Sequence, residues 1–413
     1  MVPQPPGFEL LGAGYDPTFD WLEPGQPHTI ADLRGYLTDY LGSYVLDQAV
    51  RVHVLILVGE GRENLDRLRS AGWTVDPSIL NPKGFHQCRS ATAPWGGQYV
   101  AIFRVNGRDR LGHLQTLLKL AGVPSSNVLS VGRTRSYSED YEDTFERLGG
   151  VPDLAVYGYC NSSLHRILTI LPANREAHFP LFDRQRAHRQ RRLRDDQHDL
   201  TALPLQEVVF AGGKKVWFLS DLYGDLVVEL LEALADHGVR RLVAMGTAGA
   251  LRGNIVLGAM LTPVRQYAED QSIVDLDYVA PIQGVPWFGT YSRVSNPNLE
   301  TVAWTERMIT AGVDVIETEM GYVFEVLRRR RDLQGSVVLL VSDILTGPKV
   351  FPRRAWGTRD TLTQLGDFNL MLGNVLGFRG NQEYRVESYR VVPLVEGAEW
   401  TEREPQQSLV GNR

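Results

Sequence analysis

The chain has 413 residues, of which 43% are hydrophobic, and a formal net charge of −6. This length allows two domains with a core each, and the absence of a basic excess argues against nucleic acid as a partner. Two cysteines, Cys88 and Cys160, are too few for a disulfide framework and lack zinc-ligand spacing, so we expect no metal and a reducing, cytoplasmic location. Neither a signal-peptide pattern nor an uninterrupted apolar run of membrane-spanning length is present, so no membrane partner is expected.

The first half of the chain shows strand–helix alternation behind an arm rich in Pro, Gly and aromatic residues, 1–40. Apolar β-branched runs predict strands, and amphipathic stretches predict the helices between them. The expected elements are strands at 51–58, 98–105 and 153–159 and helices at 64–71 and 111–121. Gly59 and Gly61 follow the first strand, but the third glycine of a dinucleotide fingerprint is missing, so such a site is not favoured.

A basic run at 183–194, balanced by acidic residues directly after it, separates the two halves. Such a run can bind phosphate, but a solvated helix face or linker explains it with fewer assumptions. We therefore predict an N-terminal α/β region at 1–200, a second α/β domain at 201–390 and a tail at 391–413.

The second half alternates more regularly and predicts a mostly parallel, mixed sheet flanked by helices. Strands are expected at 208–210, 215–219, 241–245, 255–263, 313–316 and 336–341, and helices at 225–237, 298–311 and 320–331. Ligands of such sheets bind at the carboxyl ends of the strands. This rule selects four loops: 220–225, 246–253, 317–320 and 342–349.

Three motifs in these loops occur in an order known from one enzyme superfamily. They are GVRRLVAMGTAGAL at 238–251, VIETEMGYVF at 315–324 and LVSDI at 340–344. Together they resemble the glycine-rich, ribose-binding and catalytic-aspartate segments of the superfamily of purine nucleoside phosphorylase, uridine phosphorylase and methylthioadenosine nucleosidase. The resemblance covers about 175 residues of the second half. It implies a nucleoside phosphorylase-like fold, cleavage of an N-glycosidic bond, and a homo-oligomer.

The chemistry of that reaction needs an acid at the base and acceptors around the sugar hydroxyls. Asp343 follows an apolar strand, where burial would raise its pKa, and is the candidate acid. By resemblance, Glu319 accepts the ribose hydroxyls with support from Glu317, while Thr318 replaces the methionine packed beneath the sugar. The remaining candidate binding residues are Gly246, Thr247, Ala248, Gly249, Ser342, and the aromatic pair Trp287 and Phe288, which could stack on a base.

Each of these residues also has a purely structural interpretation. Asp343 can cap a helix, and Glu317 and Glu319 can favour the positive end of a helix dipole. The glycines at 246–249 can serve a tight turn, and the aromatic pair can belong to a core. Two further acids in the first loop, Asp221 and Asp225, are expected to cap the helix that starts there.

The attacking nucleophile divides the superfamily into phosphorylases and hydrolases. Phosphorylases usually carry an arginine three residues before the Thr of the glycine-rich loop, where this chain has Ala244. Arg240, Arg252, Arg265 or Arg189 could substitute. The sequence therefore favours hydrolysis of a nucleoside or nucleotide-like substrate without cofactor. Phosphorolysis with inorganic phosphate as co-substrate, and a non-catalytic nucleoside sensor, are the alternatives.

Overall fold

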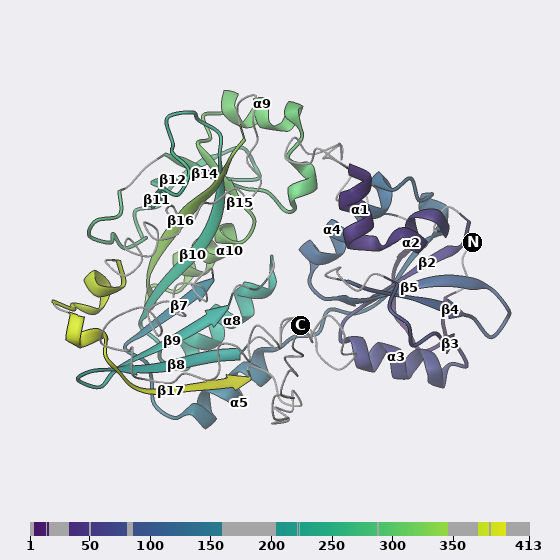
Figure 1. Cartoon of the computed structure of the whole chain (residues 1–413), viewed down its shortest axis with the longest axis horizontal. Helices are drawn as coiled ribbons and strands as arrows, with labels where there is room; N and C mark the ends of the chain where they lie inside the picture. The colour runs from purple at the N-terminus through teal and green to yellow at the C-terminus, as the bar shows by residue number, and fades with distance from the viewer. Residues whose placement is uncertain are drawn as a thin grey trace, which may run out of the picture.

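In the computed structural model, residues 4–13, 15, 33–48, 51–80, 86–158, 204–220, 222, 224–286, 289–345, 371–379 and 381–393 are described. They form two mixed sheets, a six-stranded one in the first half and an eleven-stranded one in the second (Figure 1). The chain is therefore α/β, as the sequence predicts. No helix in these ranges is long and apolar enough to cross a bilayer.

The smaller sheet has the strand order β1-β6-β2-β5-β4-β3. Its strands are β1 (Leu10–Ala13), β2 (His53–Val58), β3 (Thr74–Val75), β4 (Gln87–Thr92), β5 (Gln98–Val105) and β6 (Val128–Gly132), and its helices α1 (Leu33–Leu41), α2 (Ser43–Gln48), α3 (Gly61–Ser70), α4 (Arg108–Leu120) and η2 (Ser125–Asn127). The central pairings β6–β2 and β2–β5 are parallel. The N-terminal arm contributes β1, which pairs antiparallel with β6.

The larger sheet has the order β13-β12-β14-β15-β10-β7-β9-β8-β17, with β16 paired to β10 and β11. Its strands are β7 (Leu154–Gly158), β8 (Pro204–Phe210), β9 (Lys214–Ser220), β10 (Arg241–Ala250), β11 (Met260–Leu261), β12 (Arg265–Tyr267), β13 (Ile273–Asp275), β14 (Thr290–Arg293), β15 (Val315–Glu317), β16 (Gln334–Ile344) and β17 (Val386–Pro393). The helical segments are α5 (Ser138–Leu148), α8 (Leu226–Asp236), η4 (Pro297–Leu299), α9 (Val302–Thr310), α10 (Met320–Arg329) and η6 (Asn381–Tyr384).

The strand expected at 153–159 exists as β7, but it lies inside the larger sheet and not in the smaller one. It pairs in parallel with β9 on one side and with β10 on the other. Helix α5, which precedes it, buries Tyr141 and Phe145 in the same core as α8. The larger sheet therefore recruits residues from well before position 200, which itself falls outside the described residues. At the other end β17 continues to Pro393.

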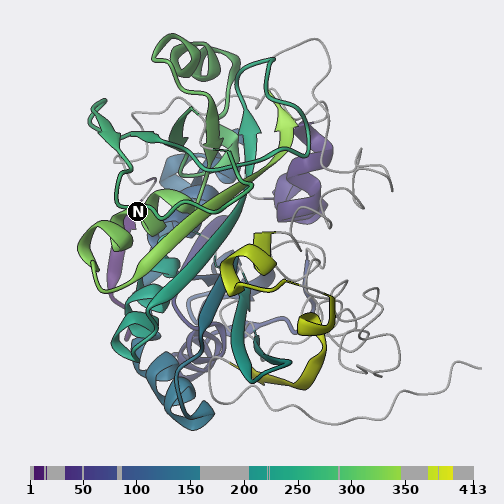
Figure 2. The same cartoon turned by 90° about the vertical axis from the view of Figure 1, so that its left-hand side faces the viewer.

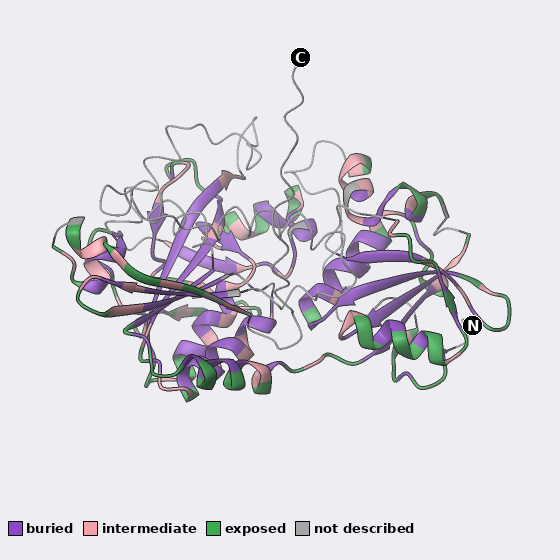
Figure 3. Ribbon diagram, turned by 60° about the horizontal axis from the view of Figure 1, so that its bottom comes forward, coloured by how far each residue is buried: buried purple, intermediate pink, exposed green. Residues whose placement is uncertain are grey.

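Strand β10 is the long central strand on which the second half is built. It runs in parallel beside β16 along its whole length, as Figure 2 shows. Its other edge pairs first with β7 and then, beyond the end of β7, with β15. One face of the sheet packs against α5, α8 and α10, and the other against the helical segment at 371–376. Figure 3 shows that the central strands of both sheets are buried.

Gly158 ends β7 at a point where the chain tolerates no side chain. Its φ is +98°, and a Cβ there would lie 2.1 Å from the carbonyl oxygen of Met245. We expect Gly158→Ala to lower the free energy of unfolding by about 3 kcal/mol or more, because strain and overlap add. Gly212→Ala is the matched control: its φ is +78° but nothing lies within 4 Å, so the loss should be about 1 kcal/mol. Urea unfolding measures both, and equal losses would contradict the steric explanation.

Candidate functional site

The acidic motifs lie on two strands that flank the carboxyl end of β10 on opposite edges. Gly249 is in register with Ile316 of β15 on one edge and with Asp343 of β16 on the other. Glu317 follows directly after Ile316 and ends β15. The strand pairing therefore brings the second and third motifs to the two sides of the first.

The glycine-rich segment is a strand and not the loop that we expected. Residues 246–250 continue β10, and 342–344 continue β16, because each finds a pairing partner in the other. A bulge at Ala248/Gly249 leaves Ser342 as the additional residue of β16. Gly246 is needed for packing: a Cβ there would lie 3.1 Å from a carboxylate oxygen of Glu317. Gly249 lies against Leu345 in the same way.

Glu317 is the buried acid of the site. Its Oε2 accepts the N–H groups of Glu319 (2.7 Å) and Met320 (2.6 Å), which open α10. It thereby caps the start of this helix, in line with the structural interpretation that the sequence also allows for Glu317. Burial, repulsion by the Glu319 carboxylate and a hydrogen bond with that group raise the pKa of Glu317 well above its usual value.

Glu319 is half-buried at the N-cap position of α10, but its side chain makes no capping hydrogen bond. The Thr318 hydroxyl donates to its Oε2 at 2.5 Å. Thr318 thus orients Glu319. A carboxylate oriented in this way can accept hydrogen bonds from hydroxyl groups.

We expect Glu317→Gln to change stability in a pH-dependent way. The raised pKa means that the folded state keeps a proton that the unfolded state loses above pH about 4.5, so wild-type stability falls as pH rises through this range. Glutamine does not titrate, so the variant should gain stability relative to wild type between pH 5 and 8. Chemical denaturation of both proteins at pH 5 and at pH 8 measures this difference in the free energy of unfolding. Glu325→Gln, an exposed partner of Arg329 on α10, is the control, and a difference independent of pH would contradict the assignment.

Asp343 lies half-buried near the end of β16. The neighbouring Ser342 hydroxyl donates to Oδ1 of Asp343 and also lies 3.4 Å from the carbonyl oxygen of Ala248. Asp343 is part of β16, and the Ser342 hydroxyl also contacts β10. These contacts fix the position of the Asp343 carboxyl group at the carboxyl edge of the sheet.

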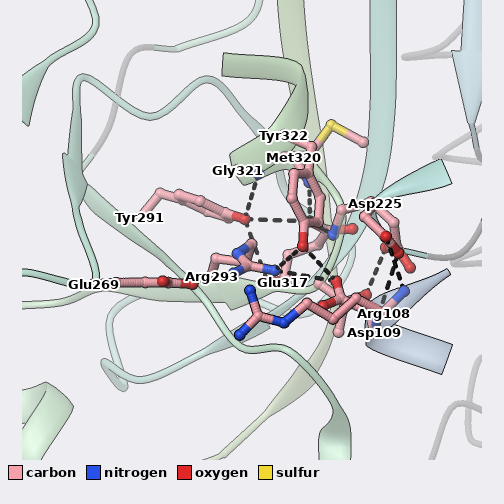
Figure 4. A network of polar contacts seen from close by, with 12 residues as sticks. Arg108, Asp109, Asp225, Glu269, Tyr291, Arg293, Glu317, Met320, Gly321 and Tyr322 are labelled. Carbon is pink, nitrogen blue, oxygen red and sulfur yellow. Dashed lines mark hydrogen bonds and ion pairs between the residues drawn. The ribbon is translucent and has the colours of Figure 1, made fainter. Parts of the chain in front are cut away.

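A second set of charged groups, which no sequence motif connects, lies next to Glu317 (Figure 4). Arg293 ends β14 in register with Glu317. Its Nη1 donates to Oδ2 of Asp109 at 3.1 Å and to the hydroxyl of Tyr322 at 2.7 Å. The Tyr322 hydroxyl in turn donates to Asp109 at 2.9 Å. Asp109 belongs to α4 of the smaller sheet, so the N-terminal half reaches the surroundings of the site.

Asp225 was expected to cap α8, and this expectation is wrong. It occupies the N-cap position of α8 without a side-chain capping bond. Its carboxylate instead accepts the N–H groups of Arg108 (2.9 Å) and Asp109 (3.3 Å) at the start of α4. Asp225 therefore caps a helix of the other half of the chain, a role that local sequence cannot indicate.

The arginines considered as substitutes for a phosphate-binding residue are engaged elsewhere or exposed. Arg240 precedes β10 at the end opposite Gly249 and pairs with Asp332 at 3.2 Å. Arg252 pairs with Asp314, and Arg265 lies exposed at the start of β12. Ala244, where the sequence resemblance would place an arginine, is fully buried in the core.

Several predicted residues fall outside the described part of the chain: Trp287, Phe288, Asp221, Arg189, the run 183–194 and the loop 346–349. Thr247 is described and half-buried on β10, beside the buried Ala248. In the described ranges no group of three or more His, Cys, Asp or Glu side chains could hold a metal ion.

Two cavities in the described ranges lie away from Glu319 and Asp343. One, of about 430 Å³, is lined by Gly59, Glu60 and Arg133 among others at the carboxyl ends of β2 and β6. There the Glu60 carboxylate accepts the N–H groups of Arg62 and Glu63 and so occupies the helix start that a pyrophosphate would need. The other, of about 150 Å³, lies near Arg241, at the beginning of β10.

No family model matches the sequence, and no curated protein matches it. Among solved structures, the chain is similar to the crystal structure of a methylthioadenosine phosphorylase sourced from an antarctic soil metagenomic library. The two are 13% identical, with a TM-score of 0.38, and the match covers 55% of this chain and 86% of that one.

Proposed function

We propose that this protein hydrolyses the N-glycosidic bond of a nucleoside or nucleotide-like substrate. The observation that carries the proposal is the placement of two carboxyl groups, on β16 and at the start of α10, on either side of the carboxyl end of β10. In this proposal Asp343 protonates the departing base, which would otherwise leave as an anion. Glu319 accepts the sugar hydroxyls, and these bonds strengthen as positive charge develops on the sugar.

The placement of the described arginines near β10 supports water over phosphate as the nucleophile. Ala244 is buried in the core, and the described arginines nearest in sequence are paired or remote from Gly249. A phosphate dianion would therefore lack the bidentate guanidinium contact that phosphorylases use. Arg293 already binds Asp109 and Glu269.

Incubation with a panel of nucleosides and nucleotides, with and without inorganic phosphate, tests the proposal by chromatography of the released base. We expect base release in phosphate-free buffer. Release only with phosphate would replace hydrolysis by phosphorolysis. Ligand-induced thermal stabilisation without product would indicate a sensor. The absence of both base release and stabilisation would refute nucleoside binding altogether.

A further inference from the structure

The carboxyl edges of the two sheets meet through a pair of matching loops. One follows β5 and opens α4, and the other follows β9 and opens α8. Gly107 has a φ of +83°, and a Cβ there would lie 2.6 Å from Asp225; Gly224 has a φ of +65°, and a Cβ there would lie 2.5 Å from Cβ of Asp109. Each loop thus places a glycine against the aspartate that follows the glycine of the other loop. The lack of a side chain at these two glycines allows the loops to approach each other closely.

Asp109 is the centre of this contact. Its side chain is 5% exposed and accepts hydrogen bonds from Arg293 and Tyr322, which belong to the larger sheet and to α10. The Arg293 guanidinium also lies 4.4 Å from the centre of the Tyr322 ring. A buried charge satisfied by two distinct donors has one strongly preferred arrangement.

The same groups hold the first turn of α10. A Cβ at Gly321 would lie 2.7 Å from Cδ of Arg293, so the arginine crosses the helix start directly. The Gly321 N–H donates to the Tyr291 hydroxyl at 2.8 Å, and Tyr291 reaches the carbonyl oxygen of Glu317 at 3.3 Å. Arg293 therefore lies beside Glu317 and against the first turn of α10, while Glu319 is near enough to Asp109 to raise the pKa of that residue. Asp109 is the counter-charge that the smaller sheet supplies to Arg293.

We propose that Asp109 is a positioning residue of the candidate site, through which the N-terminal half completes that site. Its negative charge holds Arg293 in place, so that the guanidinium does not pair with Glu319 and the Glu319 carboxylate stays available to the sugar. This inference rests on the proposed function for the identity of the ligand. Its structural part, the control of the first turn of α10 by a residue of α4, does not depend on it.

The titration of Asp109 gives this role a signature. Desolvation by burial raises the pKa of Asp109 to about 6, and the charges of Asp225 and Glu319 act in the same direction. The Arg293 charge and the hydrogen bond from Tyr322 oppose this shift. Glu269 is the other acid on Arg293. Below pH about 6 Asp109 is neutral and releases Arg293. The KM of the wild type should therefore fall as pH rises from 5 to 7.

The test uses the full chain and the nucleoside of the panel that is cleaved fastest. Asp109→Asn should raise KM about tenfold at pH 7, leave kcat within about threefold and flatten the pH dependence of KM between pH 5 and 7. Adding Arg293→Gln to this variant should return KM toward the wild-type value, because the displaced guanidinium is then absent. Asp140→Asn, which breaks the 2.9 Å pair with Arg135 elsewhere, is the control and should change neither constant.

Hydrogen exchange without ligand separates this inference from the proposed function. Asp109→Asn should speed exchange of the Gly321 and Tyr322 amides severalfold, whereas Asp140→Asn should not. If the wild type releases no base but this exchange effect is present, the proposed function fails and the coupling of α4 to α10 stands. The positioning role is overturned if Asp109→Asn behaves like the control in both kinetics and exchange. It is also overturned if kcat falls by as large a factor as KM rises and the double variant restores neither constant.

Discussion

Replacing Asp343 by Asn should lower kcat by about 10²–10⁴-fold, the usual contribution of a positioned general acid. Asparagine has nearly the same size and can still accept the Ser342 hydroxyl, which lies next to Asp343 on β16. It cannot deliver a proton to the departing base. Single-turnover kinetics measure the chemical step, and calorimetry should show nucleoside binding changed by no more than about threefold.

The control for this substitution is Asp332→Asn, just before the opposite end of β16, where the acid pairs with Arg240 and Arg330 at the surface. It should leave kcat unchanged. A substrate with a better leaving group should recover part of the activity of Asp343→Asn, since such a base needs less protonation. Full turnover of Asp343→Asn on ordinary nucleosides would remove Asp343 from the acid role.

Replacing Glu319 by Gln should lower kcat/KM by about 10²-fold, because two hydrogen bonds to a charged acceptor become neutral ones. The loss should be clearly smaller for a 2′-deoxynucleoside, which lacks one of the hydroxyls. Comparing both substrates with both proteins isolates the contact between Glu319 and the sugar.

Thr318→Val is a useful companion to this variant. It removes the hydroxyl that donates to Glu319 but keeps the shape of the side chain. A smaller loss in kcat/KM is expected, since Glu319 keeps its charge. Equal losses of Glu319→Gln on ribose and deoxyribose substrates would show that Glu319 does not contact the 2′-hydroxyl.

The local elements could be predicted from the sequence wherever burial leaves a continuous apolar run. The strand expected at 98–105 is β5 with the same bounds, and the helices expected at 225–237 and 320–331 correspond to α8 and α10. Strands β10 and β16 are longer than expected, because their polar and glycine-containing ends are held by pairing with each other. The strand expected at 255–263 is reduced to β11, since the residues before Met260 turn.

Long-range arrangement was beyond the reach of sequence patterns. Nothing in residues 154–158 indicates which sheet they join, because a buried parallel strand has the same appearance in both. The three motifs indicated which acids approach β10, since their order fixes the strands on which they lie. The contact of Asp109 with Arg293 joins residues 184 positions apart, and the capping of α4 by Asp225 joins residues 117 positions apart, so no local spacing could reveal either.

A crystal structure with a bound, slowly cleaved nucleoside analogue tests the central claim most directly. The account predicts one ligand across the end of β10, with its sugar hydroxyls within hydrogen-bond distance of Glu319 and its base within reach of Asp343. A ligand bound elsewhere, or these two side chains facing separate cavities with packed core between them, would contradict it.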